Sequence, residues 1–330
     1  MGLLQGGKWV DQWYDTEKTA GQFVREDAAF RHWITKPTPD NPHPKFEPQS
    51  GRYHLYVSLA CPWAHRTLIF RSLKSLQSHI DVTVVEPHML ANGWEFSGPN
   101  QSSDAIHIDG AEPDSLNGRD YLYQLYQQAK ADHSGRVTVP VLWDKHHNTI
   151  VSNESAEIIR MFNDTFDDIT GNTSDFYPSK LRTEIDTLND WIYQTINNGV
   201  YRVGFATTQH AYVQAFDTLF SALDTLEQRL TTQRYLTGDT ITEADWRLFT
   251  TLIRFDAVYV GHFKTNRNRL ADMPAIHAYM KALYQYPGIA ETVNFEHIKQ
   301  HYYFSHGQIN PTRIVPVGPR LDLLSPHGRD

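Results

Sequence analysis

The chain has 330 residues, 40% of them hydrophobic and 21% charged, which is ordinary for a globular protein and long enough for two domains. Its formal net charge is −8 and its basic residues are scattered, so we expect no nucleic-acid partner. No uninterrupted apolar stretch reaches membrane-spanning length and the N-terminus lacks the pattern of an export signal, so we expect a cytoplasmic protein with no membrane contact.

Residues 1–52 read as an N-terminal arm. The segment is irregular in pattern and ends in a series of prolines: Pro37, Pro39, Pro42, Pro44 and Pro48. Its tryptophans Trp9, Trp13 and Trp33 are large apolar groups that could anchor the arm onto the body of the protein.

Residues 53–165 predict an α/β domain. Alternating apolar and polar residues indicate a strand at 53–59, and apolar residues at helical spacing indicate a helix from 62 to about 77. We expect further strands at 80–86, 137–143 and 149–152, a crossover helix within LNGRDYLYQLYQQAK, and a helix from 153 to about 164. The loop before the crossover helix is longer than a crossover requires, and it carries Trp94.

From about residue 178 the pattern is that of helices only. Apolar stripes begin at Leu181 and at Phe216, and Thr242 to Asp245 forms a capping box that predicts a helix start. The sequence therefore predicts an all-helical domain over 178–309. The tail at 310–330, with four prolines, reads as a C-terminal strap along the surface.

Cys61 is the one cysteine of the chain, and it lies between the predicted strand at 53–59 and the helix that follows. Pro62 fits the first helical position, so the sulfur lies beside the unpaired amides and the positive end of the helix. This environment favours the thiolate and lowers the pKa of a thiol. A redox cycle at a single cysteine needs an external thiol to resolve it. The alternative is a buried, inert cysteine.

Three further features bear on this choice. Pro140 opens a strand, and a cis peptide bond there would turn the backbone of Val139 toward a ligand; the alternative is an edge-strand proline with nothing bound. Ser152 to Ser155 put a hydroxyl and free amides at a helix start, which suits a carboxylate, although capping by Ser152 or Asn153 would use the same groups. Trp94 either covers a bound peptide or packs in the core.

The chain contains 17 histidines, which raises the question of a metal site. It has neither a His-Glu-x-x-His motif nor a cluster of cysteine and histidine at zinc-ligand spacing. We therefore expect no metal.

A thiolate, a Val-Pro segment that pairs with backbone, and an anion site are the groups needed to hold glutathione. With these features the chain resembles the glutathione transferase superfamily, and within it the glutathionyl-hydroquinone reductases, or Xi class. The matching segments are WYDT, YHLYVSLACPWAHRTL, RVTVPVLWD, IVSNESAEIIRMFN, NNGVYRVGFA, RYLTGDTITEADWRL, RFDAVYV, NFEHIKQHYY and SPHGRD. The resemblance implies an α/β thioredoxin-like N-terminal domain followed by an all-α C-terminal domain, with extended arms at both ends.

The resemblance also implies a role for each site residue. Cys61 matches the nucleophile and Trp94 the tryptophan that covers glutathione. The other implied glutathione contacts are Arg136, Val137, Thr138, Val139, Pro140, Glu154 and Ser155. Tyr201 matches a tyrosine that exchanges a proton with the substrate, and Tyr259 and Tyr302 match tyrosines that assist the thiolate, with Tyr303 an alternative to Tyr302. Read from the sequence alone, these tyrosines would be assigned to helix packing.

The implied reaction is the reduction of glutathionyl-hydroquinones to hydroquinones, through a mixed disulfide between Cys61 and glutathione that a second glutathione resolves. The implied partners are glutathione and a glutathionylated aromatic substrate, with no permanently bound cofactor, and the implied assembly is a homodimer. Alternatives are an omega-like thioltransferase or dehydroascorbate reductase and a non-enzymatic binding module. A conjugating transferase fits less well, because Cys61 favours covalent chemistry.

Overall fold

The computed structural model describes residues 2–98 and 107–329. These residues form two compact units. The first consists of Met1–Trp13, Glu26–Ser174 and Thr292–His301, and the second of Tyr14–Arg25, Asp175–Glu291 and Tyr302–Asp330. Each unit therefore combines a large central part of the chain with one segment from near the N-terminus and one from near the C-terminus. The boundaries at 53–165 and 178–309 stay predictions.

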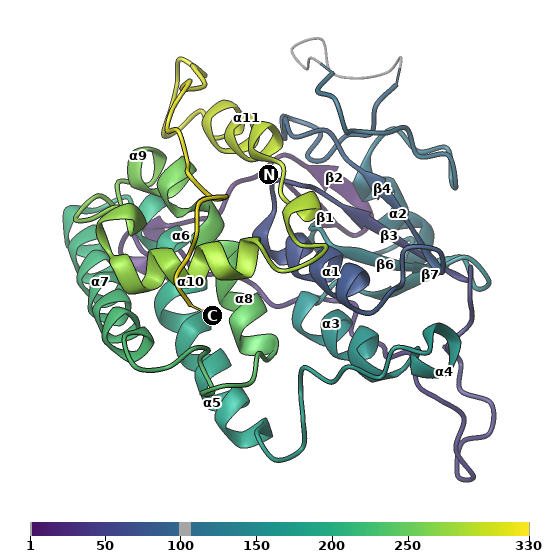
Figure 1. The fold of residues 1–330 in the computed structure, drawn as a ribbon. Helices are drawn as coiled ribbons and strands as arrows, with labels where there is room; N and C mark the ends of the chain where they lie inside the picture. Colours follow the sequence, from purple (N-terminus) through teal and green to yellow (C-terminus); the bar gives the residue numbers. More distant parts are fainter. Residues whose placement is uncertain (1, 99–106, 330) are drawn as a thin grey trace. The chain divides into compact units, whose positions relative to one another are not determined.

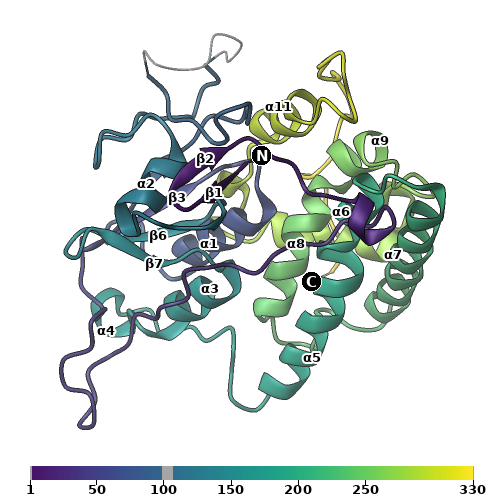
Figure 2. The same cartoon turned by 180° about the vertical axis from the view of Figure 1, so that it is seen from behind.

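The first unit is built on a four-stranded sheet in the order β4-β3-β6-β7. Its strands are β3 (Tyr53–Val57), β4 (Ile80–Val84), β6 (Val141–Asp144) and β7 (Thr149–Ser152). Strand β3 pairs parallel with β4 and antiparallel with β6, and all five of its residues are buried. Helices α1 (Pro62–Leu73) and α3 (Ser155–Asp164) cover one face and α2 (Leu122–Ala129) the other (Figures 1 and 2). This layering is the thioredoxin-like arrangement that the sequence predicts.

Several elements are shorter than predicted. Strand β3 ends at Val57 and β4 at Val84, each two residues before its expected end. The strand expected at 137–143 begins only at Val141, because Pro140 has no backbone N–H to donate to the ladder. The helix expected to reach about residue 77 ends at Leu73. Ser75 has a left-handed backbone with φ 57°, which a continuing helix cannot adopt.

The N-terminal arm is more ordered than its sequence indicates. Strands β1 (Leu3–Gln5) and β2 (Lys8–Val10) form a hairpin, and β1 pairs with β5 (Gly135–Arg136) in a second sheet ordered β2-β1-β5. Trp9 anchors it, with its ring stacked on Tyr123 at 4.8 Å between centroids and its Nε1 donating to the carbonyl of Ala91 at 2.9 Å. The predicted anchoring by Trp33 is wrong, because that side chain is 42% exposed.

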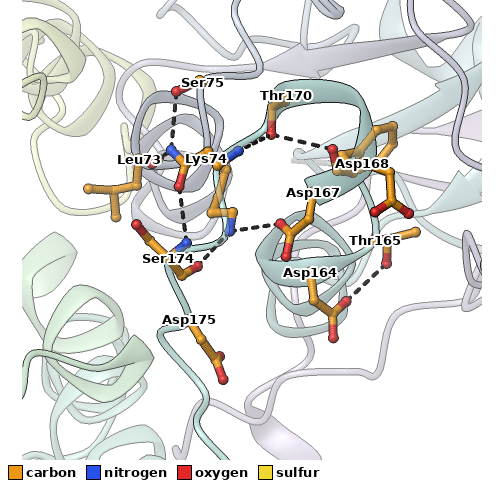
Figure 3. Close-up of polar contacts among 12 residues, drawn as sticks. Leu73, Lys74, Ser75, Asp164, Thr165, Asp167, Asp168, Thr170, Ser174 and Asp175 are labelled. Carbon is orange, nitrogen blue, oxygen red and sulfur yellow. Dashed lines mark hydrogen bonds and ion pairs between the residues drawn. The ribbon is translucent and has the colours of Figure 1, made fainter.

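The end of α1 is tied to the helix α4 (Asp167–Thr170) by the buried side chain of Lys74, as Figure 3 shows. Its Nζ lies 2.9 Å from Oδ1 of Asp167 and donates to the carbonyl of Ser174 at 2.5 Å. Asn172 adds bonds from Nδ2 to the carbonyl of Leu73 and to Oγ of Ser75. These contacts fix residues 172–174 against the end of α1.

The second unit is mostly helical. Its helices are α5 (Arg182–Ile192), α6 (Gly199–Gly204), α7 (Gln209–Leu230), α8 (Glu243–Arg254), α9 (Val260–His262) and α10 (Pro274–Tyr284), with π-helical turns η2 (Tyr193–Asn197) and η3 (Phe255–Tyr259). Short 3₁₀ turns lie at η1 (Glu17–Thr19), η4 (Leu270–Asp272) and η5 (Ala290–Thr292), and α11 (Phe295–Ser305) begins in the first unit and ends in the second. The predicted cap of α8 is confirmed, since Asp245 accepts from the backbone N–H of Thr242 at 2.8 Å.

Candidate active site

Cys61 is the N-cap residue of α1, with Pro62 at the first helical position, as the sequence predicts. Its backbone is extended, and its carbonyl accepts the first helical bond from His65 at 3.0 Å. Cys61 is half-buried, and its Sγ atom lies 3.7 Å from the carbonyl oxygen of Val139. The thiol therefore lies at the amide end of a helix and beside the Val-Pro segment.

The Val139–Pro140 peptide bond is cis, the isomer that the sequence left open. The segment before it is held by Tyr126, whose hydroxyl donates to the carbonyl of Thr138 at 2.8 Å and accepts from its N–H at 3.2 Å. Asn153 adds a bond from Nδ2 to Oγ1 of Thr138 at 3.2 Å. Sequence reasoning missed both supports. Tyr126 stood out only as part of the apolar spacing of the crossover helix.

Glu154, rather than Ser152 or Asn153, is the N-cap residue of α3. Its Oε1 accepts from the backbone N–H of Ala156 at 2.9 Å, and Ser152 Oγ accepts from the N–H of Glu154 at 3.1 Å. Ser155 is buried at the first position of the helix, with its Oγ 3.5 Å from a guanidinium nitrogen of Arg66. The start of α3 thus places a carboxylate and a hydroxyl side by side.

The guanidinium of Arg136 contacts the N-terminal arm. It donates to the carbonyl oxygens of Gln12 and Trp13, the latter at 3.3 Å, and its Nε lies 3.5 Å from Oε1 of Glu26. The sequence assigned Arg136 to glutathione binding and gave no indication of these contacts. The arm is therefore attached next to the segment that carries Val139.

Trp94 is buried, and its indole stacks on the ring of His301 with 4.8 Å between centroids and 23° between planes. The partner comes from α11, about 200 positions further along the chain, and the sequence gave no indication of it. The carbonyl of Trp94 accepts from the N–H of Leu122, the first residue of α2, at 2.9 Å.

The second unit brings the three tyrosines together. The hydroxyl oxygen of Tyr302, from α11, lies 2.6 Å from that of Tyr201 in α6 and 3.1 Å from that of Tyr259 in η3. Burial, reinforced by the neighbouring phenols, raises the pKa of Tyr302 well above 10, so Tyr302 stays protonated at neutral pH. The ring of Tyr303 lies against His262, with 4.9 Å between centroids.

Aromatic and cationic groups surround Tyr201 within the same unit. The rings of Phe263 and Phe205 lie 5.5 and 6.0 Å from the ring of Tyr201, and the guanidinium of Arg25 lies over that ring at 5.0 Å. Arg25 belongs to the stretch of the arm that packs with this unit. The tyrosine cluster is therefore set in an apolar, ring-lined environment.

Two families match the chain. Residues 60–165 match the family described as Glutathione S-transferase, N-terminal domain, and residues 206–282 match Glutathione S-transferase, C-terminal domain. The chain is 54% identical over 332 residues to the glutathionyl-hydroquinone reductase YqjG of Escherichia coli (strain K12), covering 100% of this chain and 99% of that protein. The solved structure of the Xi glutathione transferase of Phanerochaete chrysosporium matches with a TM-score of 0.86 at 50% identity, covering 93% of this chain and 96% of that chain. The chain belongs to the glutathionyl-hydroquinone reductases, the Xi class of glutathione transferases.

Two further comparisons concern this reductase family. The Escherichia coli relative has been solved with glutathione bound, and the two structures superpose with a TM-score of 0.87 at 51% identity over 99% of each chain. A Schizosaccharomyces pombe relative called glutathione S-transferase omega-like 2 is 49% identical over 92% of this chain and 96% of that protein. The predicted family and fold are confirmed.

In this reductase the first unit offers thiol, backbone and carboxylate groups, and the second unit offers the three phenols. Within residues 2–98 and 107–329, no group of three or more histidine, cysteine or acidic side chains is placed to hold a metal ion. Across the same described residues, no helix is long and apolar enough to span a membrane. Cys61 can supply nucleophilic attack by sulfur, and the tyrosines can supply proton transfer by phenol.

Proposed function

We propose that this protein catalyses the glutathione-dependent reduction of glutathionyl-hydroquinones to hydroquinones. The observation that carries the proposal is the position of Cys61, the one cysteine of the chain, at the N-cap of α1 and 3.7 Å from the carbonyl of Val139. A thiolate at a helix start is a nucleophile suited to covalent chemistry at sulfur. The glutathionyl-hydroquinone reductase of Escherichia coli, at 54% identity, supports the choice of substrate.

The residues around Cys61 suit the glutathionyl part of such a substrate. The backbone of Val139, before the cis bond to Pro140, would pair with the central peptide of glutathione. Glu154 and Ser155 at the start of α3 would bind its γ-glutamyl end, where a carboxylate suits the ammonium group and the helix amides suit the carboxylate. The remaining contacts would come from Arg136, Val137 and Thr138, with Trp94 covering the ligand.

The first chemical step is attack of the Cys61 thiolate on the glutathione sulfur. A sulfur–sulfur bond forms, and the bond between sulfur and the aromatic carbon breaks with its electron pair on the carbon. That carbon must gain a proton to become part of the free hydroquinone. The products of this step are the hydroquinone and a mixed disulfide between Cys61 and glutathione.

Tyr201 supplies the proton in this proposal. Its hydroxyl lies 2.6 Å from that of Tyr302, which in turn lies 3.1 Å from that of Tyr259. A phenolate left on Tyr201 would accept a hydrogen bond from Tyr302, which stays protonated because burial raises its pKa well above 10. Proton uptake from solvent then restores Tyr201.

A second glutathione completes the cycle. Its thiolate attacks the mixed disulfide, releases oxidised glutathione and regenerates the Cys61 thiolate. The sulfur of one free glutathione and the thioether sulfur of the substrate are thereby oxidised to one disulfide, while the aromatic carbon exchanges its bond to sulfur for a bond to hydrogen and is reduced. This order needs no second protein cysteine, in agreement with the single cysteine of the chain.

The alternative is an omega-like thioltransferase or dehydroascorbate reductase, which the name of the Schizosaccharomyces pombe relative keeps open. Turnover of a glutathionyl-hydroquinone, dehydroascorbate and a small mixed disulfide should be compared at equal enzyme concentration. We expect the first to be turned over efficiently. Negligible turnover of it beside good turnover of either other substrate would favour the alternative.

The covalent step has its own test. Treatment with a glutathionyl-hydroquinone in the absence of free glutathione should add one glutathionyl group to the intact mass, and Cys61→Ala should gain none. No adduct on the unmodified chain under single-turnover conditions would contradict the mechanism. A binding module, in contrast, would keep its ligand in Cys61→Ala and show no turnover in either form.

We also propose a cytoplasmic homodimer that uses glutathione as cosubstrate and carries no permanently bound cofactor. The single cysteine suits a reducing compartment, and the family resemblance supports the dimer. Light scattering on the purified protein would test the assembly, with twice the chain mass of 38.0 kDa expected. A visible absorption spectrum of the same sample would reveal a tightly bound chromophore.

A further inference from the structure

The ring of His301 is held in one orientation against Trp94. Its Nδ1 lies 2.9 Å from the carbonyl oxygen of Pro87, and because a carbonyl can only accept, Nδ1 carries the proton. The same ring stacks on the indole of Trp94 at 4.8 Å and 23°. The hydrogen bond fixes the imidazole at one edge, so the plane that it offers to Trp94 is also fixed.

The part of α11 that carries His301 is held by hydrogen bonds to residues that precede Trp94 in the chain and to residues that follow it. Gln300 Oε1 accepts from His88 Nε2 at 3.0 Å, and His297 Nε2 donates to the carbonyl of Asp109 at 3.0 Å. His88 and His297 are fully buried. These bonds, with that from His301 to Pro87, prevent α11 from sliding relative to the segment around Trp94.

The backbone of Trp94 is fixed by other contacts. Its carbonyl accepts from Leu122, and the next carbonyl, that of Glu95, accepts from the N–H of Glu86 at 2.9 Å. Gly93 before it closes a turn through its N–H to the carbonyl of Leu90 at 2.9 Å. Loss of the His301 side chain would therefore leave the loop in place and release mainly the indole ring.

We propose that His301 is a positioning residue for glutathione binding, because it holds the indole of Trp94 in the orientation that covers the ligand. The inference rests on the proposed function, in which Trp94 covers glutathione. His301 acts through Trp94 and takes no part in the proton or sulfur chemistry. Its removal should weaken glutathione binding and leave the chemical steps intact.

The experiment measures the Kd for glutathione by calorimetry and the KM and kcat with a glutathionyl-hydroquinone. The variants are His301→Ala, which removes the ring, and His301→Phe, which keeps a ring for the stack. Trp94→Phe is the reference, and His210→Ala, at an exposed position at the start of α7, is the matched control. Fluorine NMR of protein labelled with 5-fluorotryptophan follows Trp94 directly, with its resonance assigned from Trp94→Phe.

For His301→Ala we expect the Kd for glutathione and the KM for the glutathionyl-hydroquinone to be about 3- to 10-fold higher, which corresponds to the free energy of an aromatic pair, with kcat within about twofold. His301→Phe should recover most of the affinity, and His210→Ala should match the parent protein. The Trp94 resonance should broaden or shift in His301→Ala and stay in place in His210→Ala. The NMR measurement also applies if one variant is too unstable for kinetics.

Two failures are distinguishable. If Trp94→Phe leaves the Kd for glutathione unchanged, the proposed role of Trp94 is wrong, and the role of His301 is wrong with it. If Trp94→Phe weakens binding but His301→Ala changes neither the Kd nor the Trp94 resonance, the positioning role alone is overturned. A fall in kcat without a change in Kd for His301→Ala would also contradict the inference.

Discussion

The hydroxyl oxygens of Tyr201 and Tyr302 lie 2.6 Å apart, although 101 positions separate the two residues in the chain. Tyr302 also meets Tyr259, so it is the middle member of the cluster. Tyr201 is 8% exposed, whereas Tyr302 and Tyr259 are 1% and 0% exposed. Tyr201 is therefore the most exposed of the three tyrosines.

Tyr201→Phe should lower kcat for a glutathionyl-hydroquinone by about 100-fold or more, because a positioned proton donor contributes that much to the breaking of a bond to carbon. Turnover of a small mixed disulfide should change by less than about threefold, because a thiolate leaving group needs no proton from a phenol. Steady-state kinetics with both substrates checks this. Equal losses on the two substrates would contradict a role in carbon protonation.

Tyr302→Phe should lower kcat for the same substrate by about 10- to 100-fold, because it removes the hydrogen bond that stabilises a phenolate on Tyr201. Tyr303→Phe is the matched control one position away, because the ring of Tyr303 lies against His262 and the hydroxyl contacts of the cluster join Tyr302 to Tyr201 and Tyr259. It should retain nearly full activity. The reverse ranking of the two variants would show that the cluster does not serve the reaction.

Lys74→Met should lower the free energy of unfolding by about 2 kcal/mol. The side chain of Lys74 is 1% exposed and that of Asp167 is 19% exposed, so the unpaired carboxylate is only partly able to regain water. Urea unfolding followed by circular dichroism measures the change. The double variant Lys74→Met with Asp167→Asn should recover part of the loss, and Lys180→Met, at an exposed position, should lose little. A double variant no more stable than Lys74→Met would argue against the ion pair.

Acid should destabilise the protein partly through His262. Burial lowers the pKa of His262 to about 4 from 6.5, so below pH 6.5 the unfolded chain binds a proton that the folded chain does not bind until about pH 4. The stability that this histidine contributes is therefore complete above pH 6.5 and is lost as the pH falls, by about 2 kcal/mol at pH 5.

His262→Gln cannot take up this proton, and its amide can still form a bond to His306, which His262 contacts at 3.1 Å. Its free energy of unfolding should therefore fall less between pH 7.5 and pH 5 than that of the parent protein. Urea titrations at the two pH values measure the difference. Parallel pH dependence of both proteins would contradict the assignment.

Local sequence patterns were sufficient to predict the strand and the helix on either side of Cys61. Alternation along residues 53–57 and a proline at the first helical position are signals confined to neighbouring residues, and β3 and α1 start where these signals place them. The capping box before α8 is equally local. Strands β1, β2 and β5 escaped prediction because each has only two or three residues and β1 pairs with β5 across more than 100 positions.

The side-chain contacts of the site were harder to predict from the sequence. Family resemblance, and no feature of spacing, selected three of the 17 tyrosines. Nothing local distinguished Tyr126 and Asn153, which hold Thr138, or His301, which holds Trp94. The assignment of Arg136 to glutathione alone overlooked the arm that its guanidinium contacts.

The sequence by itself determined the position of Cys61 at a helix start and the order of an α/β part followed by helices. Its single cysteine also predicts that a redox cycle at Cys61 would need an external thiol. The tertiary structure decided that Tyr302 rather than Tyr303 joins Tyr201, that Glu154 caps α3, and that the ring of Trp94 rests on His301. The physical reason is the range of the forces that fix each feature. Helix starts and strand alternation depend on residues within a few positions, whereas these contacts depend on how distant elements pack.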